Sequence, residues 1–270
     1  MSISNAPLGK KSAYIDHYDA SLLFPIPRKI KRDEIAISQP LPFYGFDLWN
    51  AYEISWLNPK GKPVVALAEI IFPANSDNLI ESKSLKLYLN SFNQTHFENA
   101  ASVKTTIEKD LSSAVNAIVL VNLFSVDSPI EIGNLQGICL DDLDINVDTY
   151  SPTPSLLSTE NSFVTEILHS HLLKSNCLVT FQPDWGSIQI DYTGKKINHG
   201  NLLRYLISFR QHNEFHEQCV ERIFMDILKQ CQPTELTVFA QYTRRGGLDI
   251  NPYRSTKKDM SAKKIRLSRQ

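Results

Sequence analysis

Apolar residues recur along this chain with two different periods, and the change from one period to the other predicts its elements. Runs of β-branched and aromatic residues over Phe43–Leu57 and Pro63–Phe72 predict two long strands. Turn residues at Asn58–Gly61 separate them, so we expect a hairpin. A helix pair and a further strand should follow, at Ile80–Leu89, Ala101–Val115 and Ala117–Phe124.

The second half of the chain predicts a similar series. Its clearest element is a helix over Phe215–Cys231, in which Phe215, Cys219, Ile223 and Ile227 form an apolar stripe at helical spacing. This stripe makes Cys219 a packing residue. We expect the other elements to be a helix at Phe163–Leu173, a hairpin of Leu178–Phe181 and Ser187–Tyr192 that turns at Asp184, a helix at Leu202–Arg210 and a strand at Leu236–Tyr242.

The two halves also match in their letters. Tyr88-Leu89 and Ser91-Phe92 correspond to Tyr205-Leu206 and Ser208-Phe209. The polar residues differ, because Glu81 and Lys83 fall opposite Asn198 and Gly200. Two copies of one unit with different polar residues predict a composite site between modules.

These patterns predict an α+β protein made of two tandem modules, each an antiparallel sheet with a helix pair. The Pro- and Ser-rich run at 151–155 is the best candidate for a linker. The expected divisions are an N-terminal arm at 1–42, a first module at 43–150, the linker at 151–155, a second module at 156–256 and a basic tail at 257–270.

Composition narrows the possible functions. The 270 residues include 28 Lys and Arg against 29 Asp and Glu, so a basic surface for direct nucleic-acid binding is not expected. We find neither a run long enough to span a membrane nor a signal-peptide core, which favours the cytoplasm. The four cysteines contain no CxxC pair, so a structural zinc site of the usual spacing is not indicated.

One cysteine has a possible proton acceptor close by in sequence. Cys177 opens an apolar run that ends at Asp184, beside Pro183 and Gly186. A thiol is the strongest nucleophile among side chains at neutral pH, but a free thiol with a pKa of about 8.5 is mostly protonated at pH 7 and needs a proton acceptor. A carboxylate can serve as that acceptor. Taken alone, the same stretch also fits a core cysteine followed by a turn-forming acid.

A wider set of motifs carries a resemblance to a known family. Glu81–Tyr88, Ser175–Gly186, Phe215–Glu217 and Tyr242–Gly247 occur in this order. Together they resemble the NADPH-dependent nitrile reductases of queuosine biosynthesis, which convert 7-cyano-7-deazaguanine to 7-aminomethyl-7-deazaguanine. The likeness covers essentially the whole chain and matches the longer, two-module branch of the family.

The resemblance implies a tunnelling fold, a homodimer and NADPH as cofactor. Cys177 is similar to the family's nucleophile, which forms a covalent thioimide with the nitrile, and Asp184 resembles its proton partner; His216 is a further catalytic candidate. The implied substrate-binding residues are Ile80, Glu81, Ser82, His216 and Glu217, and the implied NADPH contacts are Ser82, Lys83, Arg245 and Gly246. The chain has no GxGxxG, so side chains rather than a Rossmann turn would hold NADPH.

Two other functions fit part of the sequence. One is a zinc-dependent cyclohydrolase of the same fold acting on a GTP-like substrate, with Cys177 and His216 as ligands and His171 as the only further ligand close by. The other is a non-catalytic purine-binding module anchored by Glu217. Separately, Glu81 and Lys83 fit the first turn of a helix, and Arg244–Gly247 fits a solvated strand end.

Overall fold

The structure, a computed structural model, describes residues 14–259 and 265–270. Its contacts divide the chain into two units. Of the described residues, unit 1 holds those up to Glu34, Phe46–Ile130 and Arg244–Asp249, and unit 2 holds Ile35–Gly45, Glu131–Thr243 and the residues from Ile250 on. The predicted linker at 151–155 lies inside unit 2, and Pro154–Leu156 forms a 3-10 helix there. The chain passes between the units at several points, and Ile130–Glu131 is the one that precedes the longest segment of unit 2.

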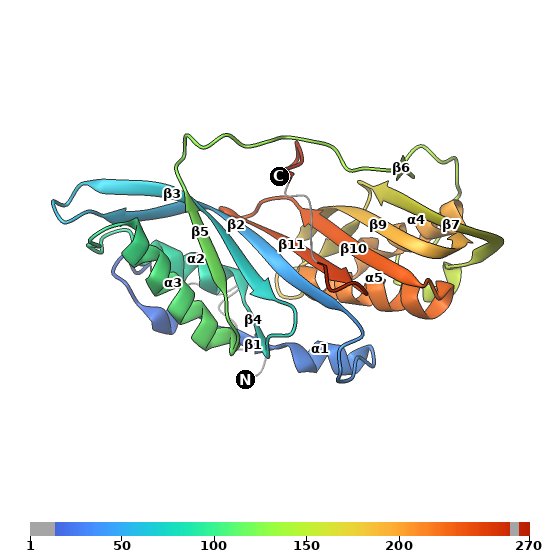
Figure 1. Cartoon of the computed structure of the whole chain (residues 1–270), viewed down its shortest axis with the longest axis horizontal. Helices are drawn as coiled ribbons and strands as arrows, with labels where there is room; N and C mark the ends of the chain where they lie inside the picture. Colours follow the sequence, from blue (N-terminus) through green and yellow to red (C-terminus); the bar gives the residue numbers. More distant parts are fainter. Residues whose placement is uncertain (1–13, 260–264) are drawn as a thin grey trace. The chain divides into compact units, whose positions relative to one another are not determined.

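Unit 1 contains the predicted hairpin and helix pair. Its sheet has the order β5-β3-β2, and both neighbouring pairs are antiparallel. The α2 and α3 helices lie on one face of this sheet (Figure 1). The elements are β1 (Pro25–Pro27), α1 (Arg28–Glu34), β2 (Tyr44–Leu57), β3 (Pro63–Pro73), β4 (Asn78–Ile80), α2 (Ser82–Asn90), α3 (Ala100–Val115) and β5 (Leu120–Phe124), preceded by a 3-10 helix at Ala20–Leu22.

The described part of the N-terminal arm is integrated into the structure. β1 pairs with β4, and Ile26 at its centre is only 1% exposed. Arg28 is also buried, and its guanidinium donates to the carboxylate of Asp47. These residues therefore belong to the core of unit 1, whereas residues 1–13 of the predicted arm lie outside the described range.

Unit 2 has a larger sheet of order β11-β10-β9-β7-β6, in which only the β6–β7 pair is parallel. The α4 and α5 helices lie on one face of it (Figure 1). Alternate residues of β10, namely Leu236, Val238 and Ala240, are fully buried on the helix side. The elements are β6 (Ile138–Cys139), β7 (Thr159–Ser170), β8 (Lys174–Asn176), β9 (Pro183–Ile197), α4 (His199–Ile207), α5 (His216–Cys231), β10 (Glu235–Tyr242) and β11 (Leu248–Ser255), with a 3-10 helix at Ser208–Gln211.

Three sequence-based expectations for unit 2 were wrong. Phe163–Leu173 is not a helix, because Thr159–Ser170 forms β7 and pairs with β9. Leu178–Phe181 is not a strand, because these residues form the turn after β8, and Asp184 lies in β9 rather than at the turn. The sequence analysis assigned no element to Leu248–Ser255, which forms β11.

The internal repeat is confirmed by matching contacts. In unit 1 the hydroxyl of Tyr88 donates to Asp110 at 2.7 Å, linking α2 to α3. In unit 2 the hydroxyl of Tyr205 donates to Asp226 at 2.7 Å and links α4 to α5 in the same way. Because each tyrosine is buried, its hydroxyl needs this partner. The repeated letters therefore mark the joint of each helix pair.

This repeat offers a matched test of stability. Asp110 also accepts from Tyr18 at 2.7 Å, so Tyr88→Phe leaves its carboxylate with a donor. Burial raises the pKa of Asp226, and the Tyr205 bond opposes that shift. We expect Tyr205→Phe to cost about 2 kcal/mol, as for a hydrogen bond to a charged group, and Tyr88→Phe to cost less. Urea unfolding midpoints of the two variants measure this, and equal losses would contradict it.

Among the described residues, no helix is long and apolar enough to cross a membrane. The basic tail is only partly described. Lys257 pairs with Glu235 at 2.6 Å, whereas Lys263 and Lys264 lie outside the described residues.

Candidate active site

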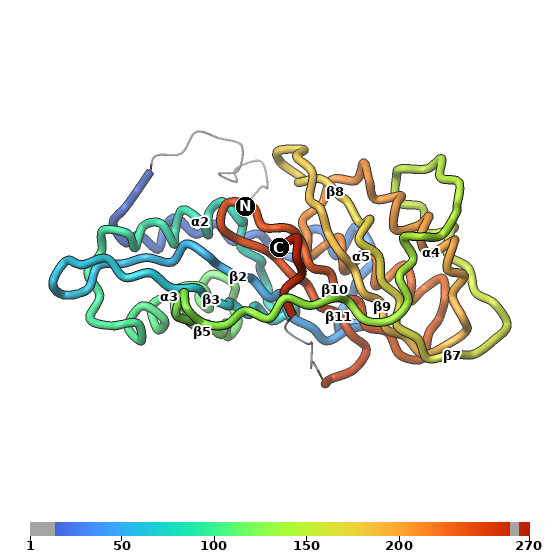
Figure 2. Tube along the Cα trace, turned by 90° about the horizontal axis from the view of Figure 1, so that it is seen from above, coloured from blue at the N-terminus to red at the C-terminus, as the bar shows by residue number. Residues whose placement is uncertain are grey.

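The β8–β9 hairpin carries both Cys177 and Asp184. Ser175 pairs with Asp184 in register, and Cys177 donates its N–H to the carbonyl of Gln182 at 2.8 Å. Cys177 is the first residue after β8, and its bond to Gln182 puts it at the same end of the hairpin as Asp184. Both are buried, at 3% and 4% exposure. The short turn between them is the yellow loop beside the β8 label in Figure 2.

A loop before α5 places His216 beside this hairpin. Asn176, the neighbour of Cys177, donates its N–H to the carbonyl of His212 at 2.7 Å and accepts from the N–H of Glu214 at 3.0 Å. The loop is thereby held against β8, and α5 begins at His216. The Nε2 atom of His216 lies 3.6 Å from Oδ1 of Asp184. The structure therefore places His216 beside Asp184, and Cys177 follows β8 in the hairpin whose second strand carries Asp184, all within unit 2.

The side chain of Glu214 also stabilises this loop. Its buried carboxylate accepts from His212 at 2.9 Å and from two nitrogens of Arg222 at 3.0 and 2.9 Å. Burial alone would raise the pKa of Glu214, but these hydrogen bonds leave it below its ordinary value. The stability that Glu214 contributes is thus present above the ordinary carboxyl pKa of 4.5 and is lost as the pH falls through the lowered value.

Tyr242, which the sequence analysis placed in a family motif without a role, borders this site. Its ring meets the ring of His216 edge-on, with 4.1 Å between centroids. Burial raises the pKa of the Tyr242 hydroxyl well above its ordinary value, and contacts with Cys219 and Ser175 involve the same hydroxyl. Cys219 is fully buried, as its place in the apolar stripe predicted, and burial raises its pKa to about 12. Cys219 thus packs against Tyr242 in the interior of unit 2.

Glu217 occupies the first turn of α5, next to His216, and is 2% exposed. A carboxylate at this position is favoured by the partial positive charge of the helix N-terminus. Its burial beside the Cys177–Asp184–His216 group is compatible with an anchor for a polar ligand edge.

Three further predicted residues lie at the start of α2 in unit 1. Ile80 ends β4, Glu81 is the N-cap, and Ser82 is the first helical residue. The Glu81 carboxylate accepts from the N–H groups of Lys83 and Ser84, each at 2.8 Å. Burial raises the pKa of Glu81, although these two bonds oppose the shift. The helix-capping interpretation of Glu81 therefore holds, and the residue is fully buried.

Arg245 and Gly246 lie in a tight turn of unit 1. Arg245 and Leu248 exchange backbone hydrogen bonds of 2.8 and 3.0 Å, and Gly246 and Gly247 have φ of 57° and 78°. Two left-handed residues define the turn type that glycine suits best. A Cβ on Gly246 would lie 3.3 Å from Cδ of Lys86. The missing side chain thus leaves the turn's backbone open beside a lysine.

This turn fits an anionic cofactor such as NADPH. Lys86 lies 3.3 Å from Glu53 and is about one-third exposed, and the Arg244 guanidinium lies 4.5 Å from the ring centroid of Tyr52. Cations beside an open backbone turn suit phosphate groups. Lys83, by contrast, lies in the first turn of α2 next to the Glu81 cap. Ser82, Lys83, Arg245 and Gly246 remain the predicted NADPH contacts. Lys86 lies next to Gly246 of the turn.

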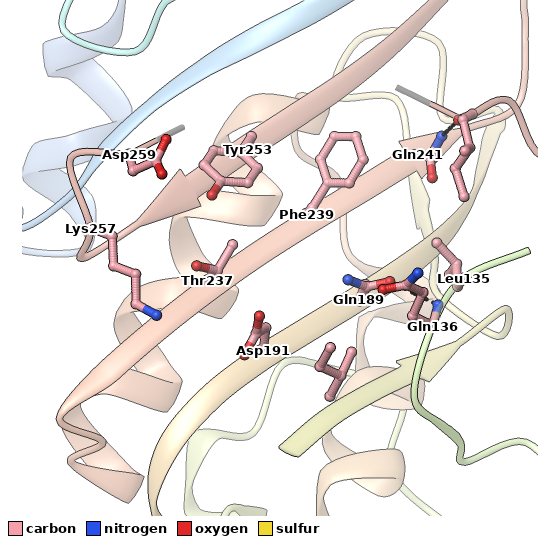
Figure 3. A pocket seen from close by; sticks show the side chains of 12 residues that line it. Leu135, Gln136, Gln189, Asp191, Thr237, Phe239, Gln241, Tyr253, Lys257 and Asp259 are labelled. Atoms are coloured by element: carbon pink, nitrogen blue, oxygen red, sulfur yellow. Dashed lines mark hydrogen bonds between the residues drawn. The ribbon is translucent and has the colours of Figure 1, made fainter. Parts of the chain in front are cut away.

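The hollow in unit 2 shown in Figure 3 lies elsewhere. It has a volume of about 360 Å³ and lies on the sheet face opposite α4 and α5. Its polar lining includes Asp191, Gln189 and Gln241. It includes none of the predicted catalytic or binding residues, so we do not place the chemistry there.

The zinc interpretation finds little support in this geometry. Within residues 14–259 and 265–270, no three His, Cys, Asp or Glu side chains are grouped to hold a metal ion. The Nδ1 atom of His171 lies 2.8 Å from the Ser187 hydroxyl, and Nε2 of His212 lies 2.9 Å from Glu214.

Comparison with known proteins agrees with the resemblance seen in the motifs. The family model described as nitrile reductase, 7-cyano-7-deazaguanine-reductase N-term matches residues 14–123, and the model described as QueF-like protein matches residues 183–261. A relative from Coxiella burnetii (strain CbuK_Q154), named NADPH-dependent 7-cyano-7-deazaguanine reductase, is 59% identical over 97% of this chain and 96% of its own length.

Relatives with the same name from Azoarcus sp. (strain BH72) and Cupriavidus necator are 57% and 59% identical. These matches cover 95% and 93% of this chain, and 92% and 93% of the relatives. The chain therefore belongs to the family of 7-cyano-7-deazaguanine nitrile reductases.

Proposed function

We propose that this chain reduces the nitrile of 7-cyano-7-deazaguanine to the aminomethyl group with NADPH, through a covalent bond to Cys177. The observation that carries the proposal is the grouping of Cys177, Asp184 and His216 on one hairpin and one helix start. Full-length relatives at 57–59% identity bear the name of this activity. The test is an intact-protein mass after mixing with 7-cyano-7-deazaguanine alone, which should rise by one substrate.

Cys177 solves the main chemical difficulty of the reaction. A nitrile accepts hydride poorly, whereas a thioimide is a polarised C=N group. The sulfur of Cys177 bonds to the nitrile carbon, and one π bond of the nitrile breaks. The thiol proton passes to Asp184, and from there to the nitrile nitrogen, so one carboxyl serves both transfers.

Bound NADPH supplies a hydride in each of two reduction steps. Between the steps the C–S bond breaks, Cys177 recovers its proton, and an imine remains. Water would hydrolyse this imine, and the burial of Cys177 and Asp184 keeps water from it. We assign to His216 a further proton transfer, and the 3.6 Å between its Nε2 and Oδ1 of Asp184 supports this assignment.

We assign substrate recognition to two groups of the predicted residues, one at the start of α5 and one at the start of α2. Glu217 accepts two hydrogen bonds from the N–H and NH₂ edge of the guanine-like ring. Leaving that buried carboxylate half satisfied costs about 1–3 kcal/mol per lost partner, which rejects rings without the edge. Ile80, Glu81 and Ser82 supply further substrate contacts, and Ser82, Lys83, Arg245 and Gly246 contact NADPH.

The remaining assignments follow from the same family membership. We infer a homodimer built on tunnelling-fold modules that acts in the cytoplasm on a free purine-like molecule. The nearly equal numbers of basic and acidic residues, 28 and 29, support a small-molecule substrate over direct binding to nucleic acid.

The repeat provides a test of Glu81 as a substrate contact. Asn198 caps α4 at the equivalent position and accepts from the N–H of Asn201 at 3.0 Å. Glu81→Asn therefore keeps a capping side chain but removes the carboxylate. We expect kcat/KM for 7-cyano-7-deazaguanine to fall about tenfold or more, because a substrate donor loses its partner, with little change in Tm.

Asn198→Ala is the matched control for capping alone. It should lower Tm, since losing a cap costs about 0.5–2 kcal/mol, and leave KM for the substrate unchanged. Steady-state kinetics and thermal unfolding measure both variants. A Glu81→Asn protein with wild-type kcat/KM would reduce Glu81 to a helix cap.

A further inference from the structure

Strands β10 and β11 flank the Arg245–Gly247 turn, but their ladder stops before the turn begins. The β10–β11 ladder pairs Thr237–Phe239 with Tyr253–Ser255. Counting on from this register places Gln241 opposite Asn251. β10 itself stays paired with β9 as far as Tyr242 and Gly186. The end of β10 therefore needs support on its β11 side.

The side chain of Gln270 fills that position. Its Nε2 donates to Oδ1 of Asn251 at 2.7 Å and to the carbonyl of Tyr242 at 3.3 Å. Its Oε1 accepts from Nε2 of Gln241 at 2.9 Å and from the N–H of Leu267 at 3.1 Å. Gln270 is 7% exposed, and both amide donors and both acceptor positions are used. One amide thus joins β10 to β11 where the ladder has stopped.

The segment that carries Gln270 is fixed by several other contacts. Arg266 forms a parallel bridge with Ile132, and its carbonyl accepts from the N–H of Gly133 at 2.9 Å. Gln241 also donates to the carbonyl of Ile265 at 2.7 Å, at the end of β10 seen in Figure 3. Leu267 is buried at 5% exposure. Gln270 is therefore presented by an ordered segment rather than by a loose end.

Tyr242 connects this amide to the candidate active site. Gln270 holds the Tyr242 carbonyl, while the Tyr242 ring lies edge-on to His216 at 4.1 Å. A Cβ on Gly186 would come within 3.1 Å of the Tyr242 ring, so the ring has little freedom on that side. His216 in turn lies 3.6 Å from Asp184. Movement of the β10 end would change the position of the His216 imidazole.

We propose that Gln270 is a positioning residue for the reductase reaction: it fixes Tyr242, and through Tyr242 the orientation of His216 against Asp184. The proposal rests on the function assigned above to these three residues. It predicts that the hydrogen bonds of Gln270, and not merely its volume, are needed. Gln270→Met keeps most of the volume and removes the bonds, whereas Gln270→Ala removes both.

The first measurement needs no substrate. NMR of the full-length protein follows the ring protons of His216, which are assigned by comparison with His216→Asn. The chemical shifts of these protons report the position of the nearby Tyr242 ring. We expect these resonances to move in both Gln270→Ala and Gln270→Met. Ser268→Ala, at an exposed position of the same segment that makes none of these bonds, should leave them in place.

The second measurement is steady-state reduction of 7-cyano-7-deazaguanine. In both Gln270 variants kcat should fall about tenfold with KM nearly unchanged, because a misplaced catalytic group slows the reaction more than it weakens binding. Unmoved His216 resonances, or wild-type resonances and kcat in Gln270→Met, would overturn the proposal. A wild-type protein that reduces nothing would instead refute the proposed function, while the NMR comparison would still decide the positioning role.

Discussion

Replacing Cys177 with alanine is expected to reduce nitrile turnover by about 10⁴-fold or more, because loss of a covalent nucleophile removes the whole pathway that it opens. The nitrile would then have to accept hydride directly. Binding should survive, since the substrate contacts assigned to Glu217 and Glu81 remain. The measurement is NADPH consumption under saturating substrate, together with calorimetric binding of 7-cyano-7-deazaguanine.

Cys139→Ala is the control for this variant, because Cys139 is an exposed thiol on β6 of the same unit. It should keep wild-type turnover. A Cys177→Ala protein that retains activity would show that the thiol is a packing residue, which is the alternative that its burial also allows.

The second large effect is expected from Asp184→Asn. The amide is close in size but cannot accept the thiol proton, so adduct formation should slow by about 10²–10⁴-fold, the usual range for general acid–base catalysis. The variant should still fold, because β9 pairs through its backbone at this position. Rapid mixing followed by acid quench and mass measurement gives the rate of adduct formation.

Asp191 offers a matched control on the same strand. It lines the hollow on the sheet face away from the helices, seven residues after Asp184. Asp191→Asn should leave the adduct rate unchanged. Equal rates in wild type and Asp184→Asn would assign the proton transfer to another group, with His216 the next candidate.

Much of the fold could be predicted from periodicity. The Phe43–Phe72 hairpin and the stripe of α5 have long, regular patterns, and the structure contains both. The repeat was visible in letters because each tyrosine of the helix pair needs an acidic partner, Asp110 or Asp226. These features depend on local pattern and on burial, which a sequence records directly.

The errors have physical causes of two kinds. Residues 163–173 have apolar positions that fit either period, and pairing of β7 with β9 decided in favour of a strand. The turn after β8 includes Phe181 with φ of 58°, a conformation that a bulky residue seldom adopts and that composition does not announce. Pro183 then opens β9, a position where proline is tolerated in a strand.

The candidate site was predicted through the family resemblance rather than through local pattern. Spacing alone left Cys177 and Asp184 as a core residue and a turn former, and only the pairing of β8 with β9 puts them on one hairpin. Tyr242 was given no role because an aromatic residue in a strand ordinarily means core. Gln270 gives no sequence signal at all, since its role depends on three residues more than eighteen positions away.

The most direct test of the covalent mechanism is an intact-protein mass after mixing with 7-cyano-7-deazaguanine in the absence of NADPH. Wild type and Cys177→Ala are compared under mild conditions that preserve a thioimide. The account predicts a wild-type mass raised by one substrate, no increase in the variant, and loss of the added mass when NADPH is supplied. An unmodified wild-type protein that nevertheless binds the substrate tightly would contradict it and would leave a purine-binding module as the better description.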